Sequence, residues 1–245
     1  MNAMTGLSSP VCLYLVRHGE TAWSLSGQHT GRTDLPLTAN GERESHELAV
    51  RLRGVHFSHV LSSPRRRAQQ TCELAGLGRQ QQIDVDLAEW EYGDYESRRT
   101  AEIHEIRPDW NIFQDGCPHG ELPIQVSDRA DRLIARLRKL DGNIALFTHG
   151  HFGAVLGVRW IGLPLLQAQH FSLASASLSI LGEDPRRPGM PVLALWNAKS
   201  AHASDPASRR GGDDPAGMRR RALERWENEG GELLNQRRFD IAGEK

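Results

Sequence analysis

Three short, largely apolar runs along the chain are each followed at once by polar or basic residues. They cover residues 11–16, 60–62 and 144–147. Runs of this length without regular polar alternation are typical of strands that are buried on both faces. A chain that repeats this pattern must cover its strands with helices on two sides.

Helical patterns separate these runs. We expect helices over 38–53, 64–75, 126–140 and 155–160, and further strands over 83–87, 177–181 and 192–196. Thr38 can cap the first of these helices, and Pro64 suits the first turn of the second. The alternation of strands and helices predicts an α/β fold, a three-layer α/β/α sandwich with a mainly parallel central sheet.

The polar segments that follow the three buried runs are candidates for one binding site. They are Arg17-His18-Gly19, Ser62-Ser63-Pro64 with Arg65 to Arg67, and Thr148-His149-Gly150. Ligands of open α/β sheets bind outside the carboxyl ends of the strands, where these segments would meet. Their basic character indicates an anionic ligand.

The composition argues against several classes of partner. The formal net charge is −1, so no global basic field favours nucleic acid. The apolar run at 11–16 is too short to span a bilayer, and residues 1–10 contain no Lys or Arg, which disfavours a signal peptide. Cys12, Cys72 and Cys117 match no zinc or C-x-x-C spacing, so we expect reduced thiols. We therefore expect a cytoplasmic protein without nucleic-acid or membrane partners; the sequence leaves its oligomeric state open.

The carboxyl-terminal part of the chain differs in composition from the rest. Residues 198–217 are rich in Ala, Ser, Gly, Asp and Pro, which is typical of a flexible linker. Residues 218–245 resemble a charged helical tail, with Leu223 and Trp226 as apolar points. We therefore expect one catalytic domain over 1–197, followed by this linker and tail.

Five motifs occur in one order, and together they resemble those of the histidine phosphatase, or phosphoglycerate mutase-like, superfamily. They are Leu15-Val16-Arg17-His18-Gly19-Glu20-Thr21, Thr30-Gly31 with Asp34 to Gly41, Ser62 to Thr71, Leu87 to Glu96, and Thr148-His149-Gly150. The resemblance covers roughly residues 11–197 and implies the phosphoglycerate mutase-like version of the predicted sandwich. It also implies a phosphohistidine intermediate, with His18 as the nucleophile and Glu89 as the proton donor.

The chemistry of phosphoryl transfer explains why such residue types are needed. Without a metal, positive charge and hydrogen-bond donors must surround three phosphoryl oxygens, and Arg17, Arg67 and His149 can supply them. A histidine nucleophile must be neutral, and nearby arginines would lower its pKa from about 6.5. Further residues are expected to bind phosphate or substrate: Ser24, Thr30, Gly31 and Gly150.

Other interpretations of the same segments are weaker. Glu91 and Glu96 compete with Glu89 for the acid role, but the motif register favours Glu89. His149 and His151 could suggest a metal, yet two histidines at i, i+2 without a carboxylate are weak evidence. We expect neither a metal nor a cofactor. Cys117 as nucleophile lacks a pattern of basic neighbours.

Finer resemblance favours hydrolysis of small phosphorylated metabolites such as sugar phosphates. The segments 22–31, 89–96 and 115–121 are similar to bacterial acid phosphatases and fungal sedoheptulose-1,7-bisphosphatases. The alternatives are a phosphoglycerate mutase and, from another class, a non-catalytic phosphate-binding scaffold. Two positions depart from the family pattern, Ser97 where Gly is frequent and Leu122 where Ser is frequent. The segment 108–123 is expected to form a lid or a substrate wall.

Overall fold

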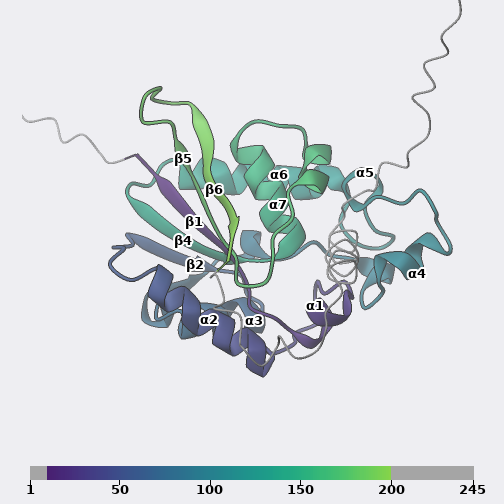
Figure 1. Ribbon diagram of the computed structural model, residues 1–245. Coiled ribbons are helices and arrows are strands. Elements are labelled where there is room, and N and C mark those ends of the chain that lie inside the picture. The colour runs from purple at the N-terminus through teal and green to yellow at the C-terminus, as the bar shows by residue number, and fades with distance from the viewer. Residues whose placement is uncertain (1–9, 200–245) are drawn as a thin grey trace, which may run out of the picture.

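The central element of the computed structural model, which describes residues 10–199, is a sheet of six strands in the order β3-β2-β4-β1-β5-β6 (Figure 1). The strands β3, β2, β4 and β1 run parallel to one another, and at one edge β5 is antiparallel to β1 and β6 is antiparallel to β5. The strands are β1 (Cys12–Arg17), β2 (His59–Ser62), β3 (Gln81–Ile83), β4 (Asn143–Thr148), β5 (Leu178–Glu183) and β6 (Pro191–Ala198).

Helices cover both faces of the sheet. On one face lie α2 (Ala39–Arg51) and α3 (Arg66–Leu74), and on the other lie α6 (Pro123–Leu137) and α7 (Gly150–Trp160) (Figure 1). Alternate residues of a strand point to opposite faces, so each central strand contributes to two cores. Leu13 and Leu15 pack with the α6 and α7 side, whereas Val16 packs with the α2 and α3 side. The predicted three-layer sandwich is confirmed.

Two helix starts show how local chemistry sets the boundaries. The Thr38 side chain accepts a hydrogen bond from the Gly41 amide at 3.0 Å and caps α2, as predicted. Helix α6 begins three residues before the predicted start, because Pro123 fits the first helical position, where no amide donor is needed.

One predicted strand is wrong. Residues 83–87 were expected to be extended, but the strand is β3, which ends at Ile83, and Val85–Leu87 forms the short 3-10 helix η2. The Asp84 carboxylate accepts a hydrogen bond from the Asp86 amide at 3.0 Å. Such local side-chain bonds stabilise a turn in competition with a strand.

Shorter elements lie between these helices and strands. They are α1 (Ala22–Ser26), η1 (Gly78–Gln80), η3 (Gly93–Tyr95), α4 (Thr100–His104), α5 (Ile112–Asp115) and η4 (Leu165–His170).

Two loop segments beyond the sheet are joined to each other. Gln28 and Arg99 form an isolated antiparallel bridge, and the His29 amide donates to the Arg98 carbonyl at 2.9 Å. The Glu96 carboxylate accepts from the amides of Gly31 and Thr33 at 3.0 and 2.9 Å. We call residues 28–33 and 96–99 the paired loops.

The described residues end shortly after β6. Apart from Ala198 and Lys199, the predicted linker and tail at 198–217 and 218–245 lie outside them. Within residues 10–199, no helix is long and apolar enough to cross a membrane.

Candidate active site

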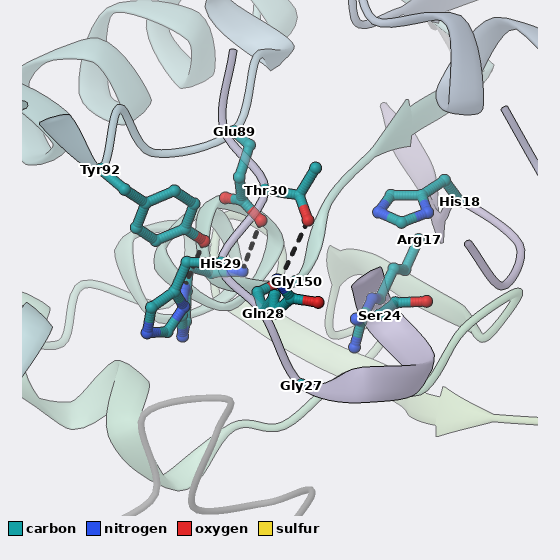
Figure 2. A pocket seen from close by; sticks show the side chains of 11 residues that line it. Arg17, His18, Ser24, Gly27, Gln28, His29, Thr30, Glu89, Tyr92 and Gly150 are labelled. Atoms are coloured by element: carbon teal, nitrogen blue, oxygen red, sulfur yellow. Dashed lines mark hydrogen bonds between the residues drawn. The ribbon is translucent and has the colours of Figure 1, made fainter. Parts of the chain in front are cut away.

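A cavity lies at the carboxyl ends of β1 and β4, where the sequence predicts an anion site. Arg17 pairs with Thr148 in the parallel register of these strands, so the residues that follow them emerge side by side. The cavity encloses about 60 Å³. Its lining is polar and aromatic (Figure 2): Arg17, His18, Ser24, Gly27, Gln28, His29, Thr30, Glu89, Tyr92, Gly150 and His151.

The orientation of the His18 ring leaves one nitrogen available. Its Nδ1 lies 2.7 Å from the carbonyl oxygen of Gly19. Because a carbonyl only accepts, Nδ1 must carry the proton, and in the neutral ring Nε2 keeps its lone pair. The backbone is fixed as well: the His18 amide donates to the Thr148 carbonyl at 3.0 Å, and the Gly19 amide donates to the Thr71 hydroxyl at 2.9 Å.

The surroundings of His18 favour its neutral form. Burial lowers its pKa well below the usual 6.5, and the charges of Arg67 and Arg17 lower it further, against the opposing effect of the Gly19 carbonyl. The direction agrees with the expectation from the sequence. Burial is the largest cause, which the sequence alone did not indicate.

The two arginines of the motifs occupy different places. Arg17 lines the cavity, donates to the Leu173 carbonyl and lies against Gly150, where an added Cβ would come within 3.3 Å of its guanidinium carbon. Arg67 is fully buried, is not among the lining residues, and donates to the carbonyls of Thr30 and Thr33 at 2.7 and 3.1 Å. Its Nε has no hydrogen-bond partner among the described residues.

His149, the residue that precedes α7, is also fully buried and is not among the lining residues. Its ring centroid lies 5.2 Å from that of His18, and its Nε2 lies 2.7 Å from the Ser63 hydroxyl. Its Nδ1 has no hydrogen-bond partner within the described chain. Burial, followed by Arg67, lowers the pKa of His149, so the ring is neutral. Ser63 was not singled out from the sequence, although it is the second residue of the Ser62-Ser63-Pro64 motif.

Of the three competing carboxylates, Glu89 lines the cavity. It accepts hydrogen bonds from the amides of Phe152 at 2.8 Å and His151 at 3.2 Å, at the amino-terminal end of α7. A helix amino terminus offers free amides to such a group. Glu91 is engaged with Arg32 at 2.7 Å, and Glu96 holds the paired loops.

One wall of the cavity was not expected from the sequence. Its uncharged part consists of Tyr92 and His29, which we call the neutral wall, and His151 lies beside them. The Tyr92 hydroxyl lies 2.7 Å from His151 Nδ1, and the Tyr92 ring stacks on His29 with centroids 4.7 Å apart. Burial raises the pKa of Tyr92 well above 10 and lowers that of His29 to about 3. Only their position within the motif segments could have marked these residues.

The segment 108–123 packs against the neutral wall and against His151. Phe113 packs edge-on to His151 with centroids 5.5 Å apart, and Trp110 packs against His29 at 5.8 Å. Both aromatic rings are buried and neither lines the cavity. The segment therefore contributes to the predicted wall indirectly.

The remaining predicted residues divide into two groups. Ser24 and Thr30 line the cavity, with Ser24 fixed by reciprocal capping bonds with Thr21. Gly31 does not line it. Its amide donates to Glu96, and an added Cβ would lie 2.6 Å from the Trp90 carbonyl, so Gly31 is required by close packing.

Two alternative chemistries find no support in residues 10–199. No group of three or more His, Cys, Asp or Glu side chains there could hold a metal ion. Burial raises the pKa of Cys117 to about 12, so this side chain is a protonated thiol rather than a nucleophilic thiolate.

Comparisons with known proteins agree with this arrangement. The family model of the histidine phosphatase superfamily (branch 1) matches residues 13–199. An acid phosphatase of Mycobacterium tuberculosis is 43% identical over 188 residues, which cover 75% of this chain and 92% of that protein. A sedoheptulose 1,7-bisphosphatase of Saccharomyces cerevisiae is 40% identical over 187 residues, which cover 63% of this chain and 69% of that protein.

Solved structures share the fold. The product of a Mycobacterium tuberculosis open reading frame superposes with a TM-score of 0.72 at 38% identity, covering 77% of this chain and 97% of that one. The match of the family model over most of the chain, the identity to phosphatases and the shared fold lead to one conclusion: the chain belongs to the histidine phosphatase superfamily, branch 1, and is a histidine-type phosphatase.

Proposed function

We propose that the protein hydrolyses small phosphomonoesters in the cytoplasm, without a metal, through a phosphohistidine formed on Nε2 of His18. One observation carries the proposal: the available Nε2 of His18 lies in the same cavity as Arg17 and the Glu89 carboxyl group. The three free cysteines of the described chain agree with a reducing compartment.

The reaction has two steps. In the first, the Nε2 lone pair attacks phosphorus, the bond to the ester oxygen breaks, and Glu89 gives its proton to the departing alkoxide. In the second, Glu89 takes a proton from a water molecule while the water oxygen attacks phosphorus, and the N–P bond breaks. Inorganic phosphate leaves, and both His18 and Glu89 return to their starting states.

The positive charge of the site would hold the phosphoryl group throughout. Buried donors are almost always paired in folded proteins, so Nε of Arg67 and Nδ1 of His149 are candidates to bind phosphoryl oxygens. Ser63 would support this role, because its hydroxyl can donate to Nε2 of His149 and leave the proton on Nδ1. Arg17, Gly150, Ser24 and Thr30 line the same space.

The lining favours hydrolysis over mutase activity. Among the described residues that line the cavity, Arg17 is the only one with a permanent positive charge. A mutase must retain a bisphosphorylated intermediate, and the neutral wall offers no cation to a second phosphoryl group. The names of the acid phosphatase and sedoheptulose 1,7-bisphosphatase relatives support the same choice, and sugar phosphates are the substrate class that we propose.

The test is hydrolysis of p-nitrophenyl phosphate after EDTA treatment, across pH 4–8, with His18→Ala beside the wild type. We expect wild-type turnover that is lost in the variant, together with an acid-labile phosphoryl label on the wild type only. Turnover retained by His18→Ala would exclude His18 as the nucleophile. A requirement for bisphosphoglycerate with 3-phosphoglycerate as the preferred substrate would favour the mutase.

A further inference from the structure

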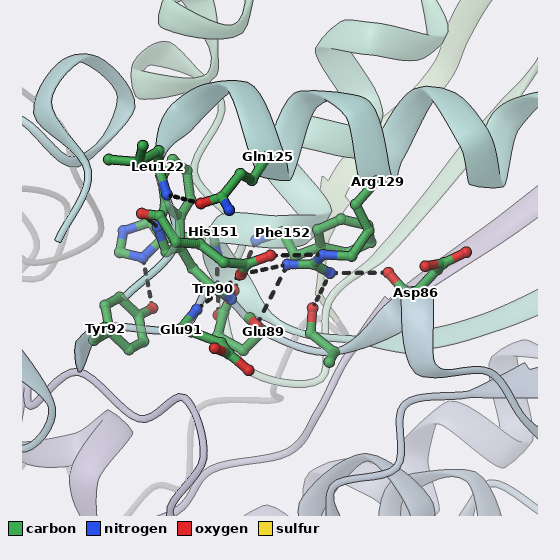
Figure 3. A network of polar contacts seen from close by, with 12 residues as sticks. Asp86, Glu89, Trp90, Glu91, Tyr92, Leu122, Gln125, Arg129, His151 and Phe152 are labelled. Carbon is green, nitrogen blue, oxygen red and sulfur yellow. Dashed lines mark hydrogen bonds and ion pairs between the residues drawn. The ribbon is translucent and has the colours of Figure 1, made fainter. Parts of the chain in front are cut away.

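Arg129 contacts the segment that carries Glu89 without lining the cavity. It extends from α6 toward residues 86–91 (Figure 3), and its side chain is only 11% exposed. The guanidinium donates to the carbonyls of Asp86 at 2.9 Å and Ala88 at 2.7 Å. These carbonyls precede Glu89, so Arg129 fixes the backbone that leads into it.

Glu121 completes this arrangement from the other side. Its carboxylate accepts from Arg129 at 3.0 and 2.8 Å and from the Glu91 amide at 2.9 Å. Its own amide donates to the Glu91 carbonyl at 2.8 Å, and its carbonyl accepts from the Trp90 indole at 2.9 Å. The residues before and after Glu89 are therefore held by one ion pair.

The same guanidinium also contacts the element that binds the Glu89 carboxyl group. Its carbon lies 4.2 Å from the centroid of the Phe152 ring. The Phe152 amide donates to Glu89 at 2.8 Å. Arg129 thus lies between the backbone of Glu89 and the helix terminus to which its side chain is bound.

We propose that Arg129 and Glu121 are a positioning pair that sets the placement of the Glu89 carboxyl group for proton transfer. The inference rests on the proposed role of Glu89. General acid catalysis depends on hydrogen-bond reach to the leaving oxygen, and a misplacement of about 1 Å costs up to ~100-fold in rate. Because the pair touches no reacting atom, its loss should affect the leaving-group step and spare phosphate binding.

The chain offers a matched control for the arginine. Arg132 lies on the same helix, and its side chain is 57% exposed. It binds the carboxylate of Asp86 at 2.7 Å. A lysine at 129 keeps the charge but lacks the planar fork that reaches two carbonyls and a carboxylate together. Arg129→Lys and Arg132→Lys therefore differ mainly in whether the backbone before Glu89 is held.

The experiment compares kcat/KM, which reports the step that breaks the ester bond, for an alkyl phosphate and for p-nitrophenyl phosphate, whose leaving group needs little protonation. For Arg129→Lys we expect kcat/KM to fall ~10- to 100-fold on the alkyl phosphate and less than ~3-fold on the aryl phosphate. Inhibition by inorganic phosphate should be unchanged. Arg132→Lys should resemble the wild type, and Glu121→Gln should show a smaller effect in the same direction.

A second comparison tests whether the effect of Arg129 on the rate depends on Glu89. In a Glu89→Gln background, Arg129→Lys should add less than ~2-fold, because two changes that act through one group are not additive. An equal loss on both substrates, or an undiminished loss in the Glu89→Gln background, would overturn the inference. If Glu89→Gln itself lowers both rates equally, the proposed acid role fails instead. Should Arg129→Lys not fold, Glu121→Gln decides by the same criteria.

Discussion

The two sides of the cavity are built in different ways. On one side, Arg17 ends β1 and His18 follows it (Figure 2), while His149 follows β4 with its ring centroid 5.2 Å from that of His18. On the other side, Glu89 and Tyr92 belong to irregular chain between η2 and η3, and His29 lies in one of the paired loops.

This difference separates two ways of placing a functional group. We call the side that carries Arg17 the cationic side. Hydrogen bonds between strands fix it, since the sheet register leaves little freedom to the residues just beyond the strands. Side-chain bonds such as those of Arg129, Glu121 and Glu96 hold the opposite side. Substitutions on the first side should therefore change the chemistry of the phosphoryl group, and those on the second should change acid delivery or stability.

The largest expected effect concerns Arg17→Met. Loss of one preorganised donor to a transferring group costs ~100- to 1000-fold in rate, and here we expect a similar loss for alkyl and aryl phosphates. The charge of Arg17 lowers the pKa of His18, so its removal should raise that pKa and shift the acidic limb of kcat/KM to higher pH. Measuring kcat/KM across pH 4–8 for both substrates would show the loss of rate and the shift of the acidic limb. A loss confined to poor leaving groups would contradict the division between the two sides.

The neutral wall should make folding sensitive to acid. The folded-state pKa of His29 is about 3, below the usual 6.5, so the unfolded chain takes up a proton first as the pH falls. The contribution of neutral His29 to the free energy of unfolding is complete above pH ~6.5 and declines as the pH falls toward 3. At pH 5 this free energy is lower by about 2 kcal/mol.

His29→Phe keeps an aromatic ring against Tyr92 and removes this titration. Urea unfolding at pH 7 and pH 5 should therefore show a smaller acid-induced loss for the variant than for the wild type. His46→Gln, on the exposed part of α2, controls for the removal of a histidine. Equal losses in His29→Phe and the wild type would place the acid sensitivity elsewhere.

The smallest expected effects concern the two departures from the family pattern. Ser97 adopts φ of 68°, a left-handed conformation that glycine adopts without strain. Leu122 occupies the cap of α6, where it makes no side-chain cap bond. Ser97→Gly and Leu122→Ser should each stabilise the fold by about 1 kcal/mol, measured by urea unfolding. A change in phosphate inhibition by either variant would show that the two sides are not independent.

The sequence predicted the cationic side better than the opposite side for a physical reason. Short apolar strands can be recognised from local pattern, and in a parallel sheet the residues just beyond their carboxyl ends must meet at one edge. Thus β1 and β4 and the residues after them were placed correctly. The strand expected over 83–87 was wrong because the side chain of Asp84 stabilises a turn there. Likewise, no local pattern indicates that Ser63 meets His149 or that Tyr92 meets His151, because these contacts are long-range.

The paired loops also bear on protein engineering. Residues 28–33 carry part of the cavity lining, but their backbone is completed by residues 96–99 through the Gln28–Arg99 bridge and the Glu96 carboxylate. A loop transplanted from another member of the superfamily without its partner would lose these bonds. The unit of exchange for altering substrate preference is therefore a pair of segments more than sixty residues apart in the chain, and recombination libraries should swap both together.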